Sequence, residues 1–179
     1  MLLNKIPVLD KGFVAVVSSS NTYASLKNLS EEFFDGESAD SLKELGTLTL
    51  VIKCPLFVQL NLSKYNLKVI NTYQLSSELE AYIPNAAEVS ASDLKTSEDI
   101  ADDLSRTTAA LLINPRAYEA DGADRFISQI ITPLNVYTTL IVHGAYTDWC
   151  AFSQAQANIP MPIKMYHEAV KQIIDSEWK

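Results

Sequence analysis

The feature that most constrains the fold is a change of hydrophobic period near residue 55. Between residues 47 and 54, large apolar side chains alternate with threonine, valine and lysine, and this period of two predicts a strand with one face in the core. From Pro55 onward the spacing is helical, and proline is favoured at the first helical position because its missing N–H would be unbonded there. The polar residues expected around the end of this mostly apolar helix are Asn61, Lys64, Asn66 and Asn71.

Other periodic segments predict strands and helices that interleave along the chain. Further strands are expected at residues 13–18, 68–73 and 136–142. Helices are expected through residues 29–33, 38–45, 96–113 and 123–131, in a segment capped by Thr147 or Asp148, and in a last segment opened by Pro162. Residues 88–95 are predicted to form a loop. Asn114-Pro115 is expected to end the helix at residues 96–113, because the residue before proline avoids the α conformation.

Length and composition predict one soluble domain that covers residues 1–179. Hydrophobic residues make up 47% of the chain and charged residues 20%, which is typical of a globular protein. No apolar run approaches the roughly 20 residues needed to cross a bilayer, and the first seven residues are too short for a secretory leader. The net charge of −8, without a basic stripe, argues against nucleic acid as a partner. We therefore expect no membrane and no nucleic acid as partners.

Cysteine and histidine usage points to a cytoplasmic protein without a metal. Cys54 and Cys150 cannot build a disulfide framework, which favours a reducing compartment, and both are interpreted as interior apolar side chains. His143 and His167 have no cysteine or carboxylate cluster at zinc-like spacing. Both histidines are therefore interpreted as structural, either facing solvent or hydrogen-bonded.

The segment that begins at Pro55 resembles the signature of the flavin-dependent thymidylate synthases. That signature follows a Pro-(Ile/Leu)-Phe-Val opening and runs Arg-His-Arg-x-x-Ser-x-Asn-Glu-x-Ser-x-Arg-Tyr. The opening is present at residues 55–58. In this frame the first arginine falls on Lys64, the histidine on Tyr65 and the second arginine on Asn66, while Asn71 is retained. The signature's serine falls on Val69, which cannot form a side-chain hydrogen bond.

Four further segments, in the family's order, extend the resemblance over most of the chain. They are residues 8–14, 82–84, 133–138 and 147–152. The resemblance implies an α+β fold, with a central, mostly antiparallel sheet and surrounding helices, in a single domain of this family. It also implies a homotetramer whose sites lie between subunits, so that a homo-oligomer is expected and mixed assembly with an active homologue is conceivable.

The family's reaction is reductive transfer of a one-carbon unit to C5 of dUMP, with FAD, a reduced nicotinamide and methylene-tetrahydrofolate. By resemblance, FAD would contact Lys64, Asn66 and Asn71. The pyrimidine nucleotide would contact Asn61, Gln129 and Gln156, of which the last two stand where the family has arginines. No catalytic residue and no metal ligand can be assigned.

The aligned anion contacts keep one cation of four. Neutral amides supply no net charge, and each lost charge-assisted contact is worth about 1.5–3 kcal/mol. The chain has three arginines in all, and the possible replacement cations are Lys68, Arg116, Arg125 and Lys164. We therefore expect the ordinary dUMP site not to survive intact.

Three hypotheses follow from these substitutions. The first is a diverged thymidylate synthase-like protein that lacks standard dUMP methylation and binds a nucleotide or a protein partner. The second is an active flavin-dependent enzyme that transfers a methyl or hydroxymethyl group to C5 of a pyrimidine nucleotide through rebuilt anion contacts. The third is a plain structural module. The corresponding interpretation of the segment is that its apolar residues are core and its asparagines cap or turn the chain; the apolar residues are Leu60, Leu62, Leu67, Val69 and Ile70, and the asparagines are Asn61, Asn66 and Asn71. We favour the first, because charged groups are removed without evident replacement.

Overall fold

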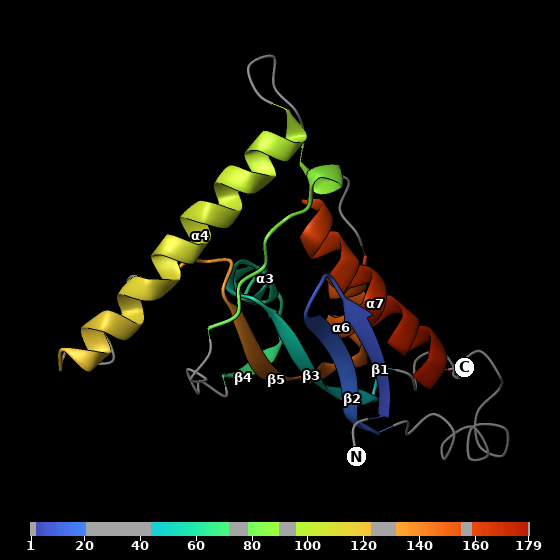
Figure 1. The fold of residues 1–179 in the computed structure, drawn as a ribbon. Helices are drawn as coiled ribbons and strands as arrows, with labels where there is room; N and C mark the ends of the chain where they lie inside the picture. The colour runs from blue at the N-terminus through green and yellow to red at the C-terminus, as the bar shows by residue number, and fades with distance from the viewer. Residues whose placement is uncertain are drawn as a thin grey trace, which may run out of the picture. The chain divides into compact units, whose positions relative to one another are not determined.

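The computed structural model describes residues 3–20, 44–71, 79–89, 96–122, 132–154 and 159–178. Five strands form one sheet in the order β1-β2-β3-β5-β4 (Figure 1). They are β1 (Leu3–Val8), β2 (Gly12–Ser20), β3 (Thr47–Pro55), β4 (Lys68–Asn71) and β5 (Tyr137–Ala145). The helices in the described ranges are α3 (Leu56–Leu62), η2 (Ala86–Glu88), α4 (Ser97–Ala120), α6 (Tyr146–Ser153) and α7 (Met161–Glu177). The predicted α+β class with a mostly antiparallel sheet is confirmed.

The chain divides into two compact units, each with its own packing. The first contains nearly all of the sheet with α6, α7 and α3 from Val58 onward, and the second contains residues 55–57, η2, α4 and the segments around residues 79–89 and 132–137. The expectation of a single domain over residues 1–179 stays a prediction. Within the described ranges, no helix has the length and apolar character that crossing a bilayer would require.

The inner face of the sheet carries the core of the first unit. Alternate residues of β3, from Leu48 to Cys54, are buried, and Leu140 and Val142 of β5 face the same way. Helix α7 packs on β1 and β2, and α6 packs on α7. Two buried side chains hold the helices to β3, because Trp149 Nε1 donates to the Leu48 carbonyl at 2.9 Å and the Tyr166 hydroxyl donates to that of Lys53 at 2.9 Å. The period of two at residues 47–54 therefore predicted the buried face correctly.

The second unit is organised around helix α4. Thr96 caps this helix: its Oγ accepts from the Asp99 N–H at 3.1 Å, while Asp99 Oδ2 accepts from the Thr96 N–H at 3.2 Å. This reciprocal pair is the capping box that the sequence predicted. Asn135 Nδ2 donates to the Tyr82 carbonyl at 2.9 Å and to Thr108 Oγ1 at 3.1 Å, which ties α4 to the neighbouring segments.

Three predicted element boundaries were wrong. Pro55 is the last residue of β3, and the helix begins at Leu56, whose N–H donates to the Val136 carbonyl at 3.0 Å. Helix α4 passes Pro115 and ends at Ala120, because a proline removes one backbone hydrogen bond but the next residues can still continue the helix. Helix α6 begins after Ala145 and has no side-chain cap, so neither Thr147 nor Asp148 caps it.

Several other boundaries agree with the prediction or lie outside the described residues. The strand predicted at residues 68–73 is present as β4 over Lys68–Asn71. The strand predicted at residues 136–142 is β5, which extends to Ala145. Pro162 lies in the first turn of α7, as expected. The helices predicted at residues 29–33 and 123–131, and most of that at 38–45, fall outside the described ranges.

Candidate functional site

The segment aligned with the family signature forms a tight connection between α3 and β4, which we call the motif turn (residues 63–67). Its backbone is closed by the Lys64 N–H donating to the Asn61 carbonyl at 3.1 Å and by the Tyr65 N–H donating to that of Leu62 at 3.1 Å. The Leu67 N–H donates to the Tyr65 carbonyl at 2.7 Å. The turn thus has a defined backbone path from the end of α3 into β4.

Behind the motif turn, Asn61 and His167 form a buried polar pair. Asn61 is 7% exposed, His167 is fully buried, and Asn61 Oδ1 lies 3.1 Å from His167 Nε2. An amide oxygen can only accept, so Nε2 donates this hydrogen bond. Nδ1 is buried without a hydrogen-bond partner in the described part of the chain. Burial lowers the pKa of His167, and the backbone of Phe152 opposes that shift.

Tyr65, at the position of the family's histidine, packs into an aromatic cluster. Its ring lies 5.2 Å from that of Phe152 and 6.2 Å from that of His167, both edge to face. The Phe152 and His167 rings stack with centroids 4.1 Å apart. Such contacts fix the orientation of the rings. The side of the motif turn that faces the core is therefore filled by packed aromatic side chains.

The predicted site residues are distributed unequally around this turn. Lys64 and Asn66 are exposed on it, whereas Asn61 faces the core and His167. The backbone of Asn71 is paired with Leu140 in the sheet. Gln129 and Gln156 lie outside the described residues, as does the side chain of Asn71. Lys64 and Asn66 therefore both lie on the exposed side of the turn, whereas Asn61 points into the core. The binding roles given to these residues stay predictions.

A row of polar side chains crosses the outer face of the sheet beside the motif turn. We call Ser18, Thr49, His143 and Lys68 the polar row. They are neighbours in the strand register: Ser18 is opposite Thr49, and Lys68 is opposite His143. Thr49 Oγ1 lies 2.9 Å from His143 Nδ1, which joins β3 to β5. The polar row thus brings a lysine, an imidazole and two hydroxyls to one surface.

Sequence reasoning found only part of the polar row. The sequence suggests Lys68 as a replacement cation and predicts a structural role for His143, and it indicates no role for Ser18 or Thr49. The alternation of residues 47–54 does indicate that Thr49 points away from the core. The strand order and register that place these four residues side by side depend on long-range pairing, which one sequence does not reveal.

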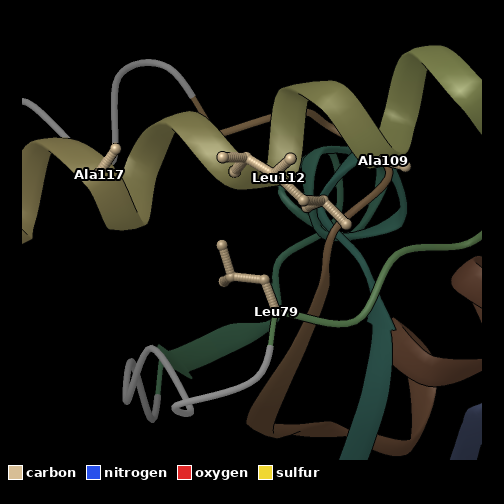
Figure 2. A pocket seen from close by; sticks show the side chains of 5 residues that line it. Leu79, Ala109, Leu112 and Ala117 are labelled. Atoms are coloured by element: carbon tan, nitrogen blue, oxygen red, sulfur yellow. The ribbon is translucent and has the colours of Figure 1, made fainter.

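The second unit contains a cavity of different character. It has a volume of about 600 Å³ and is lined by Leu79, Ala109, Leu112, Ile113 and Ala117. Figure 2 shows Leu79 directed toward α4, on the side that carries Leu112. These lining side chains offer no hydrogen-bonding group, so they cannot hold a phosphate.

The described residues offer neither a metal site nor an activated thiol. No group of three or more His, Cys, Asp or Glu side chains suited to holding a metal ion occurs within these ranges. Cys54 is fully buried, as expected, and burial raises the pKa of its thiol far above the ordinary value. Cys150 is partly exposed, so its interpretation as an interior residue holds only in part.

No protein-family model matches the sequence, and a search of curated proteins finds no relative. Solved structures do resemble the chain. Two of them are crystal structures of PolB, a UMP/dUMP methylase from Streptomyces cacaoi, one bound with 5-Br dUMP and the other with 5-Br UMP. The first has a TM-score of 0.69 at 16% identity and covers 96% of this chain and 93% of its own. The second has a TM-score of 0.70 at 16% identity and covers 97% of both chains. At this identity the likeness establishes the fold.

Proposed function

We propose that the protein binds a pyrimidine nucleotide on a UMP/dUMP methylase-like fold and lacks the standard dUMP methylation activity of the flavin-dependent thymidylate synthases. PolB, whose fold is similar over nearly the whole chain, is a UMP/dUMP methylase with bound 5-bromo nucleotides. That likeness supports a pyrimidine nucleotide as the ligand class. The proposed loss of activity rests on the residues of the motif turn.

The observation that carries the proposal is the division of the motif turn into a packed inner side and an exposed outer side. Tyr65 and Asn61 are engaged with Phe152 and His167 in the core. Lys64 is the one cation of the turn itself. Methylation at C5 requires several groups that hold the phosphate, the base and the flavin in the correct relative positions. The side chains that point inward pack in the core and cannot contact a ligand on the exposed side. One lysine and one exposed amide support binding better than catalysis.

The same residues are a poor fit for FAD. A flavin pyrophosphate carries two negative charges, and guanidinium groups are its preferred partners because they donate in a fixed fork. In the motif turn, Lys64 is the one cation, and the other exposed polar side chains, Ser63 and Asn66, are neutral. FAD, when bound, supplies the hydride chemistry in this kind of reaction. Our proposal therefore includes no step through FAD and expects a colourless protein as purified.

Equilibrium dialysis with radiolabelled dUMP, combined with an activity assay on the same preparation, tests the proposal. We expect saturable binding of dUMP and no release of tritium from [5-³H]dUMP when FAD, a reduced nicotinamide and methylene-tetrahydrofolate are supplied. Failure to bind dUMP or UMP would contradict nucleotide binding. Turnover, or a yellow protein with stoichiometric flavin, would contradict the loss of activity.

The second candidate is an active enzyme that transfers a methyl or hydroxymethyl group to C5 of a pyrimidine nucleotide. It is favoured by PolB, a methylase that shares the fold at almost full coverage of both chains. This candidate requires cations from outside the motif turn. Product analysis with UMP as well as dUMP separates the two candidates, because a methylated or hydroxymethylated base forms only in the second.

We also propose a homo-oligomer. Helix α4 exposes Leu104, Leu111 and Ile113, the last with 66% of its surface accessible in the single chain. Exposed apolar side chains on one helix are typical of subunit contacts. Light scattering on the purified protein should give a multiple of the 19.8 kDa chain mass. A monomeric mass would contradict this part of the proposal.

A further inference from the structure

We propose that the polar row on the outer face of the sheet is the phosphate-binding site of this protein, and that the neighbouring apolar residues of the same face carry the base. This inference rests on the proposed nucleotide binding and assigns its anion contact to residues that the family signature does not specify: Lys68 lies at a variable position of the signature, and Ser18, Thr49 and His143 lie outside it. It identifies the ligand class as a nucleoside monophosphate.

The geometry of the polar row suits a small tetrahedral anion. In an antiparallel sheet, side chains directly opposite each other have Cβ atoms about 4.5–5.5 Å apart. Lys68 and His143 are such a pair, and Ser18 and Thr49 are another. The Thr49–His143 contact of 2.9 Å fixes the imidazole toward β3. Three strands thus aim hydrogen-bonding groups at one surface next to the Lys68 ammonium.

The charge of the row makes it selective for anions. Lys68 and His143 are both exposed, and no carboxylate in the described part of the chain pairs with either. Among the described residues, the Lys68 ammonium beside the His143 imidazole therefore has no carboxylate counter-charge. An anion bound there would supply one, and charge-assisted hydrogen bonds to it are stronger than neutral ones.

The next row of side chains along the strands, beside the polar row, is apolar. Ile70 lies opposite Ile141, and Ala15 lies opposite Val51, so aliphatic side chains flank the polar row on the same face. Ile70 is half exposed and Val51 and Ile141 are partly exposed, whereas Ala15 is buried, so the accessible part of this row lies on β3, β5 and β4. Residues two apart on a strand are separated by about 6.8 Å. A ribose can span that step, with its phosphate on the polar row and its base over the aliphatic one.

Calorimetric titrations of the full chain with UMP, uridine and inorganic phosphate test this assignment. Lys68→Gln, which keeps the stem but removes the charge, should weaken binding of UMP and phosphate by about tenfold to a hundredfold. Thr49→Val, which keeps the β-branched shape, should weaken both by a smaller factor. Uridine binding, where measurable, should be unchanged in both variants. Lys171→Gln is the matched control, because it removes one exposed lysine from α7.

The possible results separate this inference from the proposed function. If UMP binds and Lys68→Gln behaves like Lys171→Gln, the polar row is not the site, although the protein still binds nucleotides. If phosphate binds and depends on Lys68 but UMP does not bind, the row is an anion site and the proposed function is wrong. If neither ligand binds, both are wrong. The melting temperature of Lys68→Gln should be unchanged, because Lys68 is exposed.

Discussion

At the residue scale, the Asn61–His167 pair is the feature most strongly tied to stability. Both side chains are buried, and each is the partner of the other. Replacing Asn61 by leucine leaves His167 Nε2–H without an acceptor, which should cost about 1–3 kcal/mol of unfolding free energy. Chemical denaturation measures this cost. In a His167→Phe background the same Asn61→Leu change should cost much less, because no donor is then left unpaired. Equal costs in the two backgrounds would contradict the pairing.

His167 also predicts how stability depends on pH. Burial lowers its pKa in the folded chain below the ordinary value of 6.5. Below about pH 6.5 the unfolded chain therefore binds more protons, so the unfolding free energy falls with decreasing pH until the folded-state pKa is passed. Above pH 6.5 this contribution is complete. His167→Gln should reduce the fall in stability between pH 6.5 and 5 in denaturation experiments. Identical pH profiles for wild type and variant would show that His167 does not titrate in this way.

The sequence predicted that His167 is structural, yet it did not predict the partner. The spacing of apolar residues in α7 indicates which helix face is buried, and Tyr166 and Val170 lie on that face. The bond to Asn61 joins residues 106 positions apart. Such a pair depends on how two helices meet, which local periodicity does not encode. For the same reason the inward direction of Asn61 could not be inferred from its place in the signature.

At the element scale, the junction of β5 and α6 is tightly packed around Gly144. A Cβ added at this position would collide with the Leu67 side chain of the motif turn and would lie 3.3 Å from Trp149 Nε1. Gly144→Ala should therefore destabilise the fold by about 1–3 kcal/mol through overpacking. Thermal denaturation checks this value. Because the closest atom is the end of a leucine side chain, adding Leu67→Ala should remove part of the strain, and a strictly additive loss would contradict the contact.

The course of helix α4 gives a second prediction at this scale. Its helical backbone includes position 115, where proline contributes no N–H. A proline in a helix interior costs up to about 3 kcal/mol relative to alanine. Pro115→Ala should therefore raise the stability and leave the helix signal in circular dichroism nearly unchanged, because the backbone at this position is already helical. A clear gain in helix signal would favour a helix that stops at residue 114, as the rule for residues before proline suggests.

Local rules predicted element types better than element ends. Residues 47–54 and 96–113 have clear periods and became β3 and most of α4. The two predictions that relied on proline were wrong. Pro55 is the last residue of a strand, although proline is suited to open a helix, and α4 continues past Pro115, where it was expected to end. In both cases the neighbouring structure decides the outcome, as with the Leu56 N–H bonded to the Val136 carbonyl.

At the scale of the whole molecule, the α+β class and the mostly antiparallel sheet were predicted through the family resemblance. The strand order β1-β2-β3-β5-β4 was not, because β5 is inserted between two strands that follow each other in sequence. That insertion places His143 between Thr49 and Lys68 and so creates the polar row. The candidate phosphate site therefore depends on the strand order. Of its four residues, only Lys68 is identified from the sequence, as one of the possible replacement cations.

The central claim, that this fold binds a pyrimidine nucleotide through its phosphate, is tested most directly by one calorimetric titration of the unmodified protein with UMP, with uridine as the matched ligand that lacks the phosphate. The account predicts a saturable heat for UMP and an affinity for uridine weaker by at least about tenfold. Equal affinities, or no binding of UMP at all, would contradict it.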